Sequence, residues 1–419
     1  MSITAVKGFN DILPNETFIW KFIEQTACRI FTSYGYSEIK VPVVEKTELF
    51  MRSIGETTDI VEKEMYSFLD RHGDGLTLRP EGTASVVRAY IEHKLYTAPI
   101  NKLFYYGPMF RYERPQKGRY RQFYQIGAEV MGEDHPFMDA ETIEMLVEFF
   151  KEIGLQGITL YINSLGCAEC RPGYKQTLTR YLEGVKDRLC ENCQRRLSVN
   201  PLRALDCKST GCIAATQDAP KITDSLCTRC KQHFIFVTDS LSRRGIIAIP
   251  NPRMVRGLDY YTKTTFEITA AAGLGAQNAV AAGGRYDGLV KDLGGPATPC
   301  FGFAMGMERV ALLLQETGLR SVKEPPLCAF IALGKEAEMA GTAIIKILRE
   351  DGLRVVEVFT EGGLKTRMKM ADRLGAGFAI ILGEDELKTG KVIIKDMKTA
   401  TQDTINLLDA ATALKAACA

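Results

Sequence analysis

The segment from Phe104 to Gly132 combines side chains that can bind a phosphate group with side chains that can hold a flat ring. Two runs typical of β-strands flank a charged loop, and side chains alternate between two faces along a strand. The polar face of the second run holds Phe123, Gln125, Gly127 and Glu129, and its core face holds Tyr124, Ile126, Ala128 and Val130. In the first run, Met109, Arg111 and Glu113 share a face, so Arg111 can point into the same concavity. Because a mid-strand glycine often marks the close approach of a ligand, we predict a binding site on the polar face.

The loop between these two runs is rich in cations and aromatic rings. It carries Arg114, Lys117, Arg119 and Arg121, interleaved with Tyr112 and Tyr120. Cations beside aromatic rings suit a phosphate backbone with unstacked bases. A solvated charged hairpin would have the same composition, so the pattern leaves nucleic-acid contact and a plain surface hairpin as two alternatives.

The elements that must position these side chains are helices and strands on either side of the segment. Residues 15–33 and 138–153 have the apolar spacing of amphipathic helices. Residues 35–45 alternate like a strand, and Pro42 inside this run predicts a place at a sheet edge or at a junction. Downstream we expect a strand at 264–269, a glycine-rich stretch at 273–295 and a helix at about 306–316.

The C-terminal region has a different pattern. The paired prolines of SVKEPPL (321–327) make it the best candidate for a linker. Four short apolar runs follow, namely CAFIALG, LRVVEVF, FAIILG and KVIIKDM, and helical segments at 335–350 and 364–375 separate the first three. This alternation predicts a small α/β domain with a mostly parallel sheet.

Residues 164–240 form a cysteine-rich segment that we interpret as an inserted subdomain with little apolar core of its own. Eight of the 12 cysteines lie in it: Cys167, Cys170, Cys190, Cys193, Cys207, Cys212, Cys227 and Cys230. Three of the four pairs have the spacing Cys-x₂-Cys, and two such pairs can supply a tetrahedral zinc site. The alternatives are one or two structural Zn²⁺ ions or a group of reduced thiols without metal.

Length and charge limit the class of protein. The 419 residues suggest two or three domains. Lys and Arg number 53 against 51 Asp and Glu, which argues against a surface that is basic throughout. The N-terminus has no apolar core of signal-peptide length, and no apolar run is long enough to span a bilayer. We therefore expect a cytoplasmic protein without membrane contact.

Several segments resemble the motifs of one enzyme family. GYSEIKVPVVE (35–45), the stretch around Arg111-Tyr112-Glu113, and FGFAMGMERV (301–310) resemble motifs 1, 2 and 3 of the class II aminoacyl-tRNA synthetases, in that order. VRGLDYY (255–261) and AAGGRYDGLV (281–290) are similar to two signatures of the histidyl-tRNA synthetases, and TLRPEGT (77–83) is similar to their amino-acid loop. The resemblance covers essentially the whole chain.

The resemblance implies an α+β catalytic domain built on an antiparallel sheet, plus a small C-terminal α/β domain similar to anticodon-binding domains. The expected division is a catalytic core at 1–163 and 241–322, the inserted subdomain at 164–240, and the anticodon-binding domain at 328–419. Motif 1 implies a homodimer. The implied reaction joins L-histidine to ATP, with Mg²⁺, to give histidyl-adenylate, and then transfers the histidyl group to the 3′ end of tRNA(His).

The resemblance also assigns roles to residues. Arg111 and Arg256 would grip the α-phosphate of ATP, and Arg309 would hold its γ-phosphate end. Glu113 and Phe123 would contact the adenine. The histidine pocket would comprise Glu81, Gly82, Thr83, Gln125, Glu129, Tyr260 and Tyr261, with the loop GGRYDG (283–288) bringing its backbone close. The four loop cations and the insertion would contact tRNA, and none of the four histidines is given a role.

A second class of function remains open at this point. A synthetase-like regulatory subunit without catalytic activity keeps the same core, because a fold does not fix a function. Such subunits tend to lack the anticodon domain and the catalytic arginines. This chain has Arg111, Arg256 and Arg309, and its residues 328–419 are expected to form the additional domain.

Overall fold

The structure is a computed structural model that describes residues 3–55, 58–197, 200–271, 278–316, 326–358 and 360–418. The chain divides into two compact units, Met1–Leu319 and Arg320–Ala419. Part of the predicted linker (321–325) and part of the glycine-rich stretch (273–277) lie outside the described residues. Within the described ranges, no helix is both long and apolar enough to cross a bilayer.

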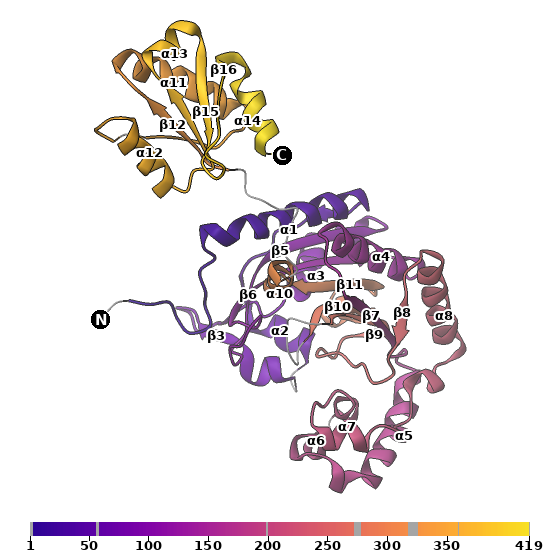
Figure 1. Ribbon diagram of the computed structural model, residues 1–419. Helices are drawn as coiled ribbons and strands as arrows, with labels where there is room; N and C mark the ends of the chain where they lie inside the picture. The colour runs from indigo at the N-terminus through magenta and orange to yellow at the C-terminus, as the bar shows by residue number, and fades with distance from the viewer. Residues whose placement is uncertain are drawn as a thin grey trace. The chain divides into compact units, whose positions relative to one another are not determined.

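The first unit is built on an eight-stranded sheet (Figure 1). In spatial order its strands are β1 (Ser37–Glu38), β5 (Asn101–Phe110), β6 (Gln122–Met131), β11 (Cys300–Gly306), β10 (Ala279–Arg285), β9 (Thr262–Ala270), β7 (Ile158–Ser164) and β8 (Ala248–Pro250). The six central strands are antiparallel, and only the edge strands β1 and β8 run parallel to their neighbours. The prediction of an antiparallel catalytic sheet is therefore confirmed for its centre.

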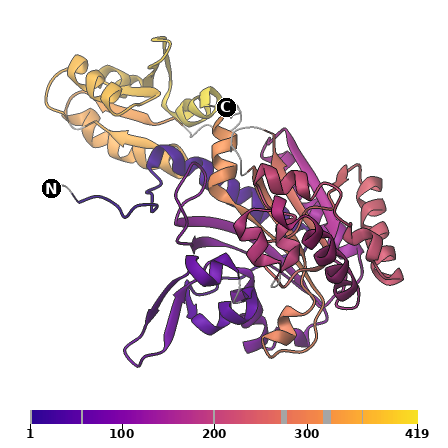
Figure 2. The same ribbon diagram turned by 90° about the horizontal axis from the view of Figure 1, so that it is seen from below.

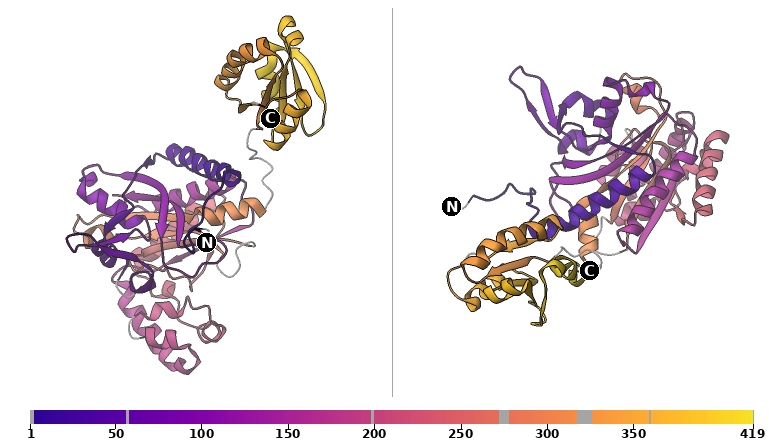
Figure 3. Two further views of the ribbon diagram at one scale, coloured as in Figure 1. Left: turned by 90° about the vertical axis from the view of Figure 1, so that its left-hand side faces the viewer. Right: turned by 90° about the horizontal axis from the view of Figure 1, so that it is seen from above.

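One face of this sheet is covered by helices, as Figures 1 and 3 show. These are α1 (Pro14–Ser33), α4 (Phe137–Glu152), α8 (Thr228–Arg243) and α10 (Met307–Glu316). The core-face residues Ile126, Ala128 and Val130 of β6 are buried among them, as the alternation predicted. The expected helices at 15–33 and 138–153 are confirmed as α1 and α4, and this packing leaves the opposite face of β5 and β6 for a site.

The opposite face is covered by α3 (Thr83–Glu92). Nearby lie α2 (Thr47–Ile54), η1 (Ile60–Glu64), η2 (Leu95–Thr97), α9 (Leu289–Asp292) and a small sheet of β2 (Val44–Lys46), β4 (Gly75–Leu78) and β3 (Tyr66–Leu69). Figure 2 shows the β3–β4 hairpin extending away from the main sheet. The segment 35–45 is not one strand, because β1 joins the main sheet and β2 joins the small one, with Pro42 between them.

The cysteine-rich segment forms a helical lobe. It contains α5 (Cys170–Gly184), η3 (Lys186–Arg188), α6 (Glu191–Arg196), η4 (Pro201–Ala204), α7 (Thr210–Ala215) and η5 (Ile222–Ser225). Leu178, Leu182 and Leu189 are buried in an apolar cluster of this lobe, so the expectation of little core was wrong. The expected range of this subdomain also includes part of α8, where Val237 packs in the core of the main sheet.

The second unit is a five-stranded sheet with helices. Its strand order is β13 (Val355–Glu357), β12 (Cys328–Ala332), β14 (Phe378–Leu382), β15 (Lys391–Asp396) and β16 (Gln402–Asn406). The helices are α11 (Lys335–Glu350), α12 (Leu364–Arg373), α13 (Glu384–Thr389), η6 (Leu407–Asp409) and α14 (Ala410–Cys418). β12 is parallel to β13 and β14, but β15 is antiparallel to both of its neighbours. The sheet is therefore mixed rather than mostly parallel.

Candidate active site

Two buried carboxylates meet between α3 and β6. Glu81 lies just before α3 and accepts hydrogen bonds from the backbone N–H groups of Thr83 (2.7 Å) and Ala84 (2.9 Å). The Thr83 hydroxyl donates to one oxygen of Glu129 over 2.8 Å, and the Tyr286 hydroxyl donates to the other over 2.5 Å. The structure thus brings together three residues predicted for the histidine pocket, namely Glu81, Thr83 and Glu129. It adds Tyr286, which lies in the GGRYDG motif but was not itself predicted as a pocket residue.

The electrostatics of this pair favour a cationic ligand. Among the described residues, the side-chain and backbone groups that donate hydrogen bonds to the two carboxylates are uncharged. Burial raises the pKa of Glu81, and burial also raises the pKa of Glu129 to about 8, with a further increase from the negative charge of Glu81. An ammonium or imidazolium group placed beside them would stabilise their charged forms.

The ring of Tyr105 fills the space that two glycines leave open. A Cβ atom added at Gly82 would lie 2.1 Å from this ring, and one added at Gly127 would lie 2.4 Å from it. Gly127 and Tyr105 are paired across β5 and β6. The prediction that Gly127 marks the approach of a ligand is therefore wrong, because a protein ring occupies that space. Gln125, on the same face, has a buried Oε1 atom without a hydrogen-bond partner among the described residues.

Tyrosines form one wall of the pocket. The ring centroids of Tyr260 and Tyr261 are 4.7 Å apart, and those of Tyr260 and Tyr286 are 5.6 Å apart. This places the two predicted tyrosines beside the residue that holds Glu129. The paired glycines of GGRYDG do not form a loop as expected: Gly283 and Gly284 lie in β10, where added Cβ atoms would meet backbone oxygens of β11 and β9 at 2.2 and 2.5 Å.

A cavity of about 210 Å³ next to this pocket is lined by residues predicted to bind ATP, among them Arg111, Glu113, Phe123 and Arg309. The guanidinium group of Arg111 lies 5.2 Å from the centre of the Phe123 ring, and its Nε–H donates to the carbonyl of Pro80 over 2.8 Å. Glu113 pairs with Arg119. Burial alone would raise the pKa of Glu113, but Arg119 and Arg111 hold it below its usual value.

A second cavity, of about 390 Å³, shares Arg309 with the first and is also lined by Arg256 and Glu267. The Nη1 atom of Arg256 lies 3.0 Å from Glu267, while its buried Nε has no hydrogen-bond partner in the described part of the chain. Burial lowers the pKa of Arg309, and the positive charges of Arg119 and Arg111 lower it further. Guanidinium groups that repel one another in a shared cavity form a site for a polyanion.

The loop between β5 and β6 gives a mixed outcome for the cations predicted to contact nucleic acid. Arg119 pairs with Glu113, Lys117 pairs with Glu316 at 2.5 Å, and the guanidinium of Arg121 stacks 3.7 Å from the centre of the Tyr112 ring. Arg114 is exposed. Arg119 also lines the smaller cavity, beside Glu113, and the residue spacing did not predict this position.

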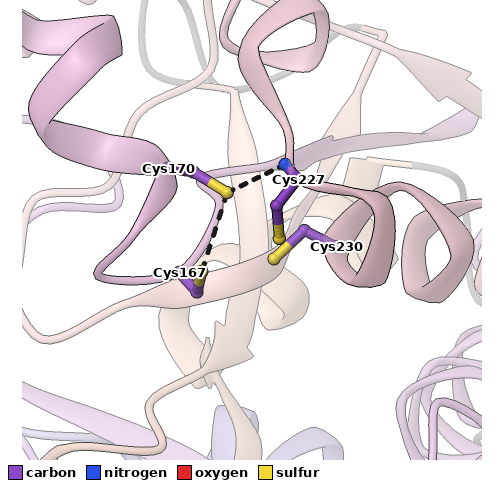
Figure 4. A group of neighbouring side chains, drawn as sticks. All are labelled: Cys167, Cys170, Cys227 and Cys230. Atoms are coloured by element: carbon purple, nitrogen blue, oxygen red, sulfur yellow. Dashed lines mark hydrogen bonds between the residues drawn. The ribbon is translucent and has the colours of Figure 1, made fainter.

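The eight cysteines of the insertion lie in two groups of four. One contains Cys167, Cys170, Cys227 and Cys230, and the other contains Cys190, Cys193, Cys207 and Cys212. Within each group all four Sγ atoms lie within 4.8 Å of one another. Figure 4 shows the first group, with its side chains converging from the beginnings of α5 and α8. The looser pair, Cys207 and Cys212, joins the pair at 190 and 193.

Comparisons with known proteins agree on one family. The sequence model described as histidyl-tRNA synthetase matches residues 8–170 and 214–310, and the anticodon binding domain matches 327–417. The histidine–tRNA ligases of Syntrophotalea carbinolica and Geobacter sulfurreducens are 55% and 56% identical, and each alignment covers 97% of both chains. The structure of the apo histidyl-tRNA synthetase of S. aureus is 36% identical, with a TM-score of 0.80, 99% of this chain covered and 100% of that one.

Proposed function

This chain belongs to the histidyl-tRNA synthetase family, and on that premise we propose that its first unit activates L-histidine with ATP and transfers the histidyl group to tRNA(His). The observation that carries the proposal is that the buried carboxylates Glu81 and Glu129, which accept hydrogen bonds from uncharged groups, lie beside the two cavities that share Arg309. The region around the carboxylates suits a cation, such as the ammonium group of histidine. The adjoining cavities suit a polyanion, such as the triphosphate of ATP.

In this proposal the amino acid lies against the buried carboxylates. Glu81, Thr83 and Gln125 bind the α-ammonium group, and the unpartnered Oε1 atom of Gln125 is a ready acceptor for it. Glu129 and Tyr261 bind the imidazole ring, with Tyr260 beside them and the backbone of Gly82 below. Hydrogen bonds to both ring nitrogens would let the pocket reject apolar analogues by roughly 10⁴-fold or more.

ATP occupies the arginine-lined cavities, together with Mg²⁺. Arg111 binds the α-phosphate from one side and Arg256 from the other, where its unpartnered Nε–H can donate. Arg309, near the start of α10, binds the γ-phosphate end. Phe123 stacks on the adenine, and Glu113 accepts from its amino group through Oε1, the carboxylate oxygen that Arg119 does not contact.

The reaction then proceeds in two displacements. A carboxylate oxygen of histidine attacks the α-phosphorus in line, a new P–O bond forms, and pyrophosphate leaves with the electrons of the broken P–O bond. The arginines neutralise charge that grows on the phosphoryl oxygens. A ribose hydroxyl of the tRNA 3′ end next attacks the acyl carbon, forms the ester and releases AMP.

The same proposal covers the partners of the site. The 327–417 unit binds the anticodon arm, and the β5–β6 loop with Arg114, Lys117, Arg119 and Arg121 meets the acceptor end. Two copies of the chain form a homodimer through the segment 35–45, which borders a cavity of about 810 Å³ lined by Ile39, Val41 and Pro42 among others. The enzyme would act in the cytoplasm.

No observation favours the alternative of an inactive regulatory subunit. The arginines expected to be lost in such a protein line two cavities, and Gln125 of the expected histidine pocket lines one of them. A C-terminal anticodon binding domain is also matched.

The deciding experiment is histidine-dependent exchange of pyrophosphate into ATP. We expect exchange with L-histidine and none above background with the other amino acids, because only an imidazole satisfies the buried polar groups of the pocket. Exchange that is absent with histidine, or equal with an apolar amino acid, would overturn the proposed function.

The role of Arg256 can be tested in the same assay. We expect Arg256→Ala to lower the rate of exchange by roughly 10²-fold or more, because a preorganised donor to the reacting phosphate is lost. Arg29→Ala removes an exposed arginine of α1 that pairs with Glu152 and should leave exchange unchanged. Near-normal exchange by the Arg256 variant would refute the assignment.

A further inference from the structure

The two cysteine quartets have the geometry of single-ion sites. The Sγ atoms of Cys167 and Cys170 are 3.6 Å apart, and those of Cys190 and Cys207 are 3.8 Å apart. Four thiolates placed tetrahedrally at about 2.3 Å from one zinc ion have S–S separations of about 3.8 Å. A disulfide would need about 2.05 Å. The close approach of all four sulfurs within each quartet also leaves room for one ion rather than for a cluster.

Backbone N–H groups point at the sulfurs in both quartets. The N–H of Cys227 donates to Cys170 over 3.2 Å, and the N–H of Cys190 donates to Cys212 over 3.1 Å. The N–H of Ser209 lies 3.5 Å from Cys207. Such donors stabilise negative charge on sulfur and fix the orientation of a ligating thiolate. Neutral thiols that merely fill an apolar core have no need of them.

The first quartet closes the base of the insertion lobe. Cys167 and Cys170 follow β7 where the chain leaves the main sheet, and Cys227 and Cys230 stand at the start of α8, where the chain returns to it (Figure 4). An ion held by this quartet would link Cys170 to Cys227, which are 57 positions apart in the sequence. Cross-links of this kind stabilise a fold mainly by restricting the unfolded chain.

The second quartet stands inside the lobe and beside the second cavity. It gathers the start of α6, the turn after η4 and the start of α7. Cys207 and Lys208 line the cavity that contains Arg256 and Arg309. An ion here would fix one wall of the cavity that the proposed function gives to ATP.

Both quartets adjoin residues that hold the segment 253–261. Arg171, next to Cys170, donates to the backbone carbonyl of Tyr261. Arg203, between Cys193 and Cys207, donates to the carbonyl of Gly257 over 2.6 Å. In return Arg253 donates to the carbonyl of Thr216 over 2.8 Å. The segment that carries Arg256, Tyr260 and Tyr261 is therefore held by the parts of the lobe that the cysteines organise.

We propose that the insertion binds two zinc ions, one in each Cys₄ quartet, and that the two sites position the 253–261 segment against the active site. Zinc is the ion expected for four thiolates in a closed tetrahedral site. The second half of the proposal rests on the proposed function, whereas the metal content does not, so the two can fail separately.

The first test is elemental analysis of the full-length protein purified without added metal or chelator. We expect about two zinc ions per chain, one for each closed Cys₄ site. Less than about half a zinc per chain, or iron in place of zinc, would overturn the metal assignment. A mercurial reagent that titrates the thiols should release the zinc into a colorimetric zinc indicator, and this measurement needs no variant to fold.

Variants locate the two ions. Cys227→Ser with Cys230→Ser, and separately Cys190→Ser with Cys193→Ser, should each reduce the content from about two zinc ions to about one. Cys28→Ser, at an exposed cysteine of α1, is the matched control and should retain both. Loss of both ions from either double variant, with the protein still folded by circular dichroism, would show one shared site and contradict the pairing.

The positioning role is tested without touching a cysteine. Arg203→Ala should keep both zinc ions but raise the KM for histidine in pyrophosphate exchange by about tenfold, because the carbonyl of Gly257 loses its charged donor. Arg180→Ala, at an exposed position of α5, should change neither quantity. An unchanged KM in the Arg203 variant would overturn the positioning role and leave the zinc assignment standing.

Discussion

Glu129 is fully buried on β6, and burial raises the pKa of its carboxyl group from 4.5 to about 8. Between these two values the folded protein holds a proton that the unfolded chain has already released. The free energy of unfolding therefore falls as the pH rises through this window, by up to about 1.4 kcal/mol per pH unit. Ionising Glu129 in the folded protein costs most when no cation is bound beside it, because a bound cation would stabilise the carboxylate.

This dependence can be measured with Glu129→Gln. The amide stays uncharged, so the variant should gain thermal stability relative to the wild-type protein as the pH is raised from about 5 to about 8. Melting temperatures of the two proteins across this range provide the measurement. Glu183→Gln, at an exposed position of α5, serves as the control and should follow the wild-type curve. Parallel curves for Glu129→Gln and the wild type would contradict the buried titration.

At the residue scale, the sequence predicts which side chains share a face but not what lies opposite them. The alternation along β6 placed Gln125 and Glu129 together and assigned Ile126 and Ala128 to the core, as observed. It could not show that Gly127 makes room for the ring of Tyr105, because that contact depends on the β5–β6 register. The sequence also could not predict the pairing of Glu113 with Arg119, because that contact depends on the conformation of the β5–β6 loop.

Among the elements, α4, α8 and β10 are joined by a buried ionic network. Asp139 of α4 is completely buried; it accepts from Arg285 of β10 over 2.8 Å and contacts His233 of α8 over the same distance. Arg285 is itself fully buried. His233, one of the histidines given no catalytic role, therefore holds two helices together.

Removal of the Asp139 carboxylate, which Arg285 and His233 share, should lower the stability of the folded protein. We expect Asp139→Ala to lower the free energy of unfolding by about 3–5 kcal/mol, because Arg285 would keep its buried charge with its closest partner gone. Asp139→Asn keeps the shape of the side chain and should cost less. Urea denaturation followed by circular dichroism measures both variants, with Asp239→Ala as an exposed aspartate control on α8. An unfolding midpoint for Asp139→Ala equal to that of the control would refute the network.

At the scale of elements, long periodic helices were predictable and sheet pairing was not. The apolar spacing of α1 and α4 identified both helices with nearly correct ends. The segment 35–45 has the alternation of one strand, yet its halves join different sheets, because Pro42 provides no backbone N–H for continued pairing. In the second unit, the runs that became β12 and β15 have the same apolar character, so composition could not distinguish parallel from antiparallel neighbours.

For the whole molecule, the division into units separates two proposed tasks. The buried carboxylates, both arginine-lined cavities and the cysteine quartets all lie before Leu319, whereas the anticodon binding domain matches 327–417. The near-balance of 53 basic and 51 acidic side chains means that tRNA must be held by local patches rather than by overall charge. Binding at two separate patches multiplies affinity only while both are in one chain.

Truncation after Leu319 should therefore separate the two steps of the reaction. The shortened chain retains every group proposed to contact histidine and ATP, so we expect histidine-dependent pyrophosphate exchange to persist. Charging of tRNA(His) should fall by about 10²-fold or more, because one of two binding regions for the tRNA is lost. Circular dichroism and the zinc content of the truncated protein report whether the first unit remains folded. If exchange and charging declined in equal proportion in a folded truncated chain, the second unit would serve the adenylation site itself rather than the binding of tRNA.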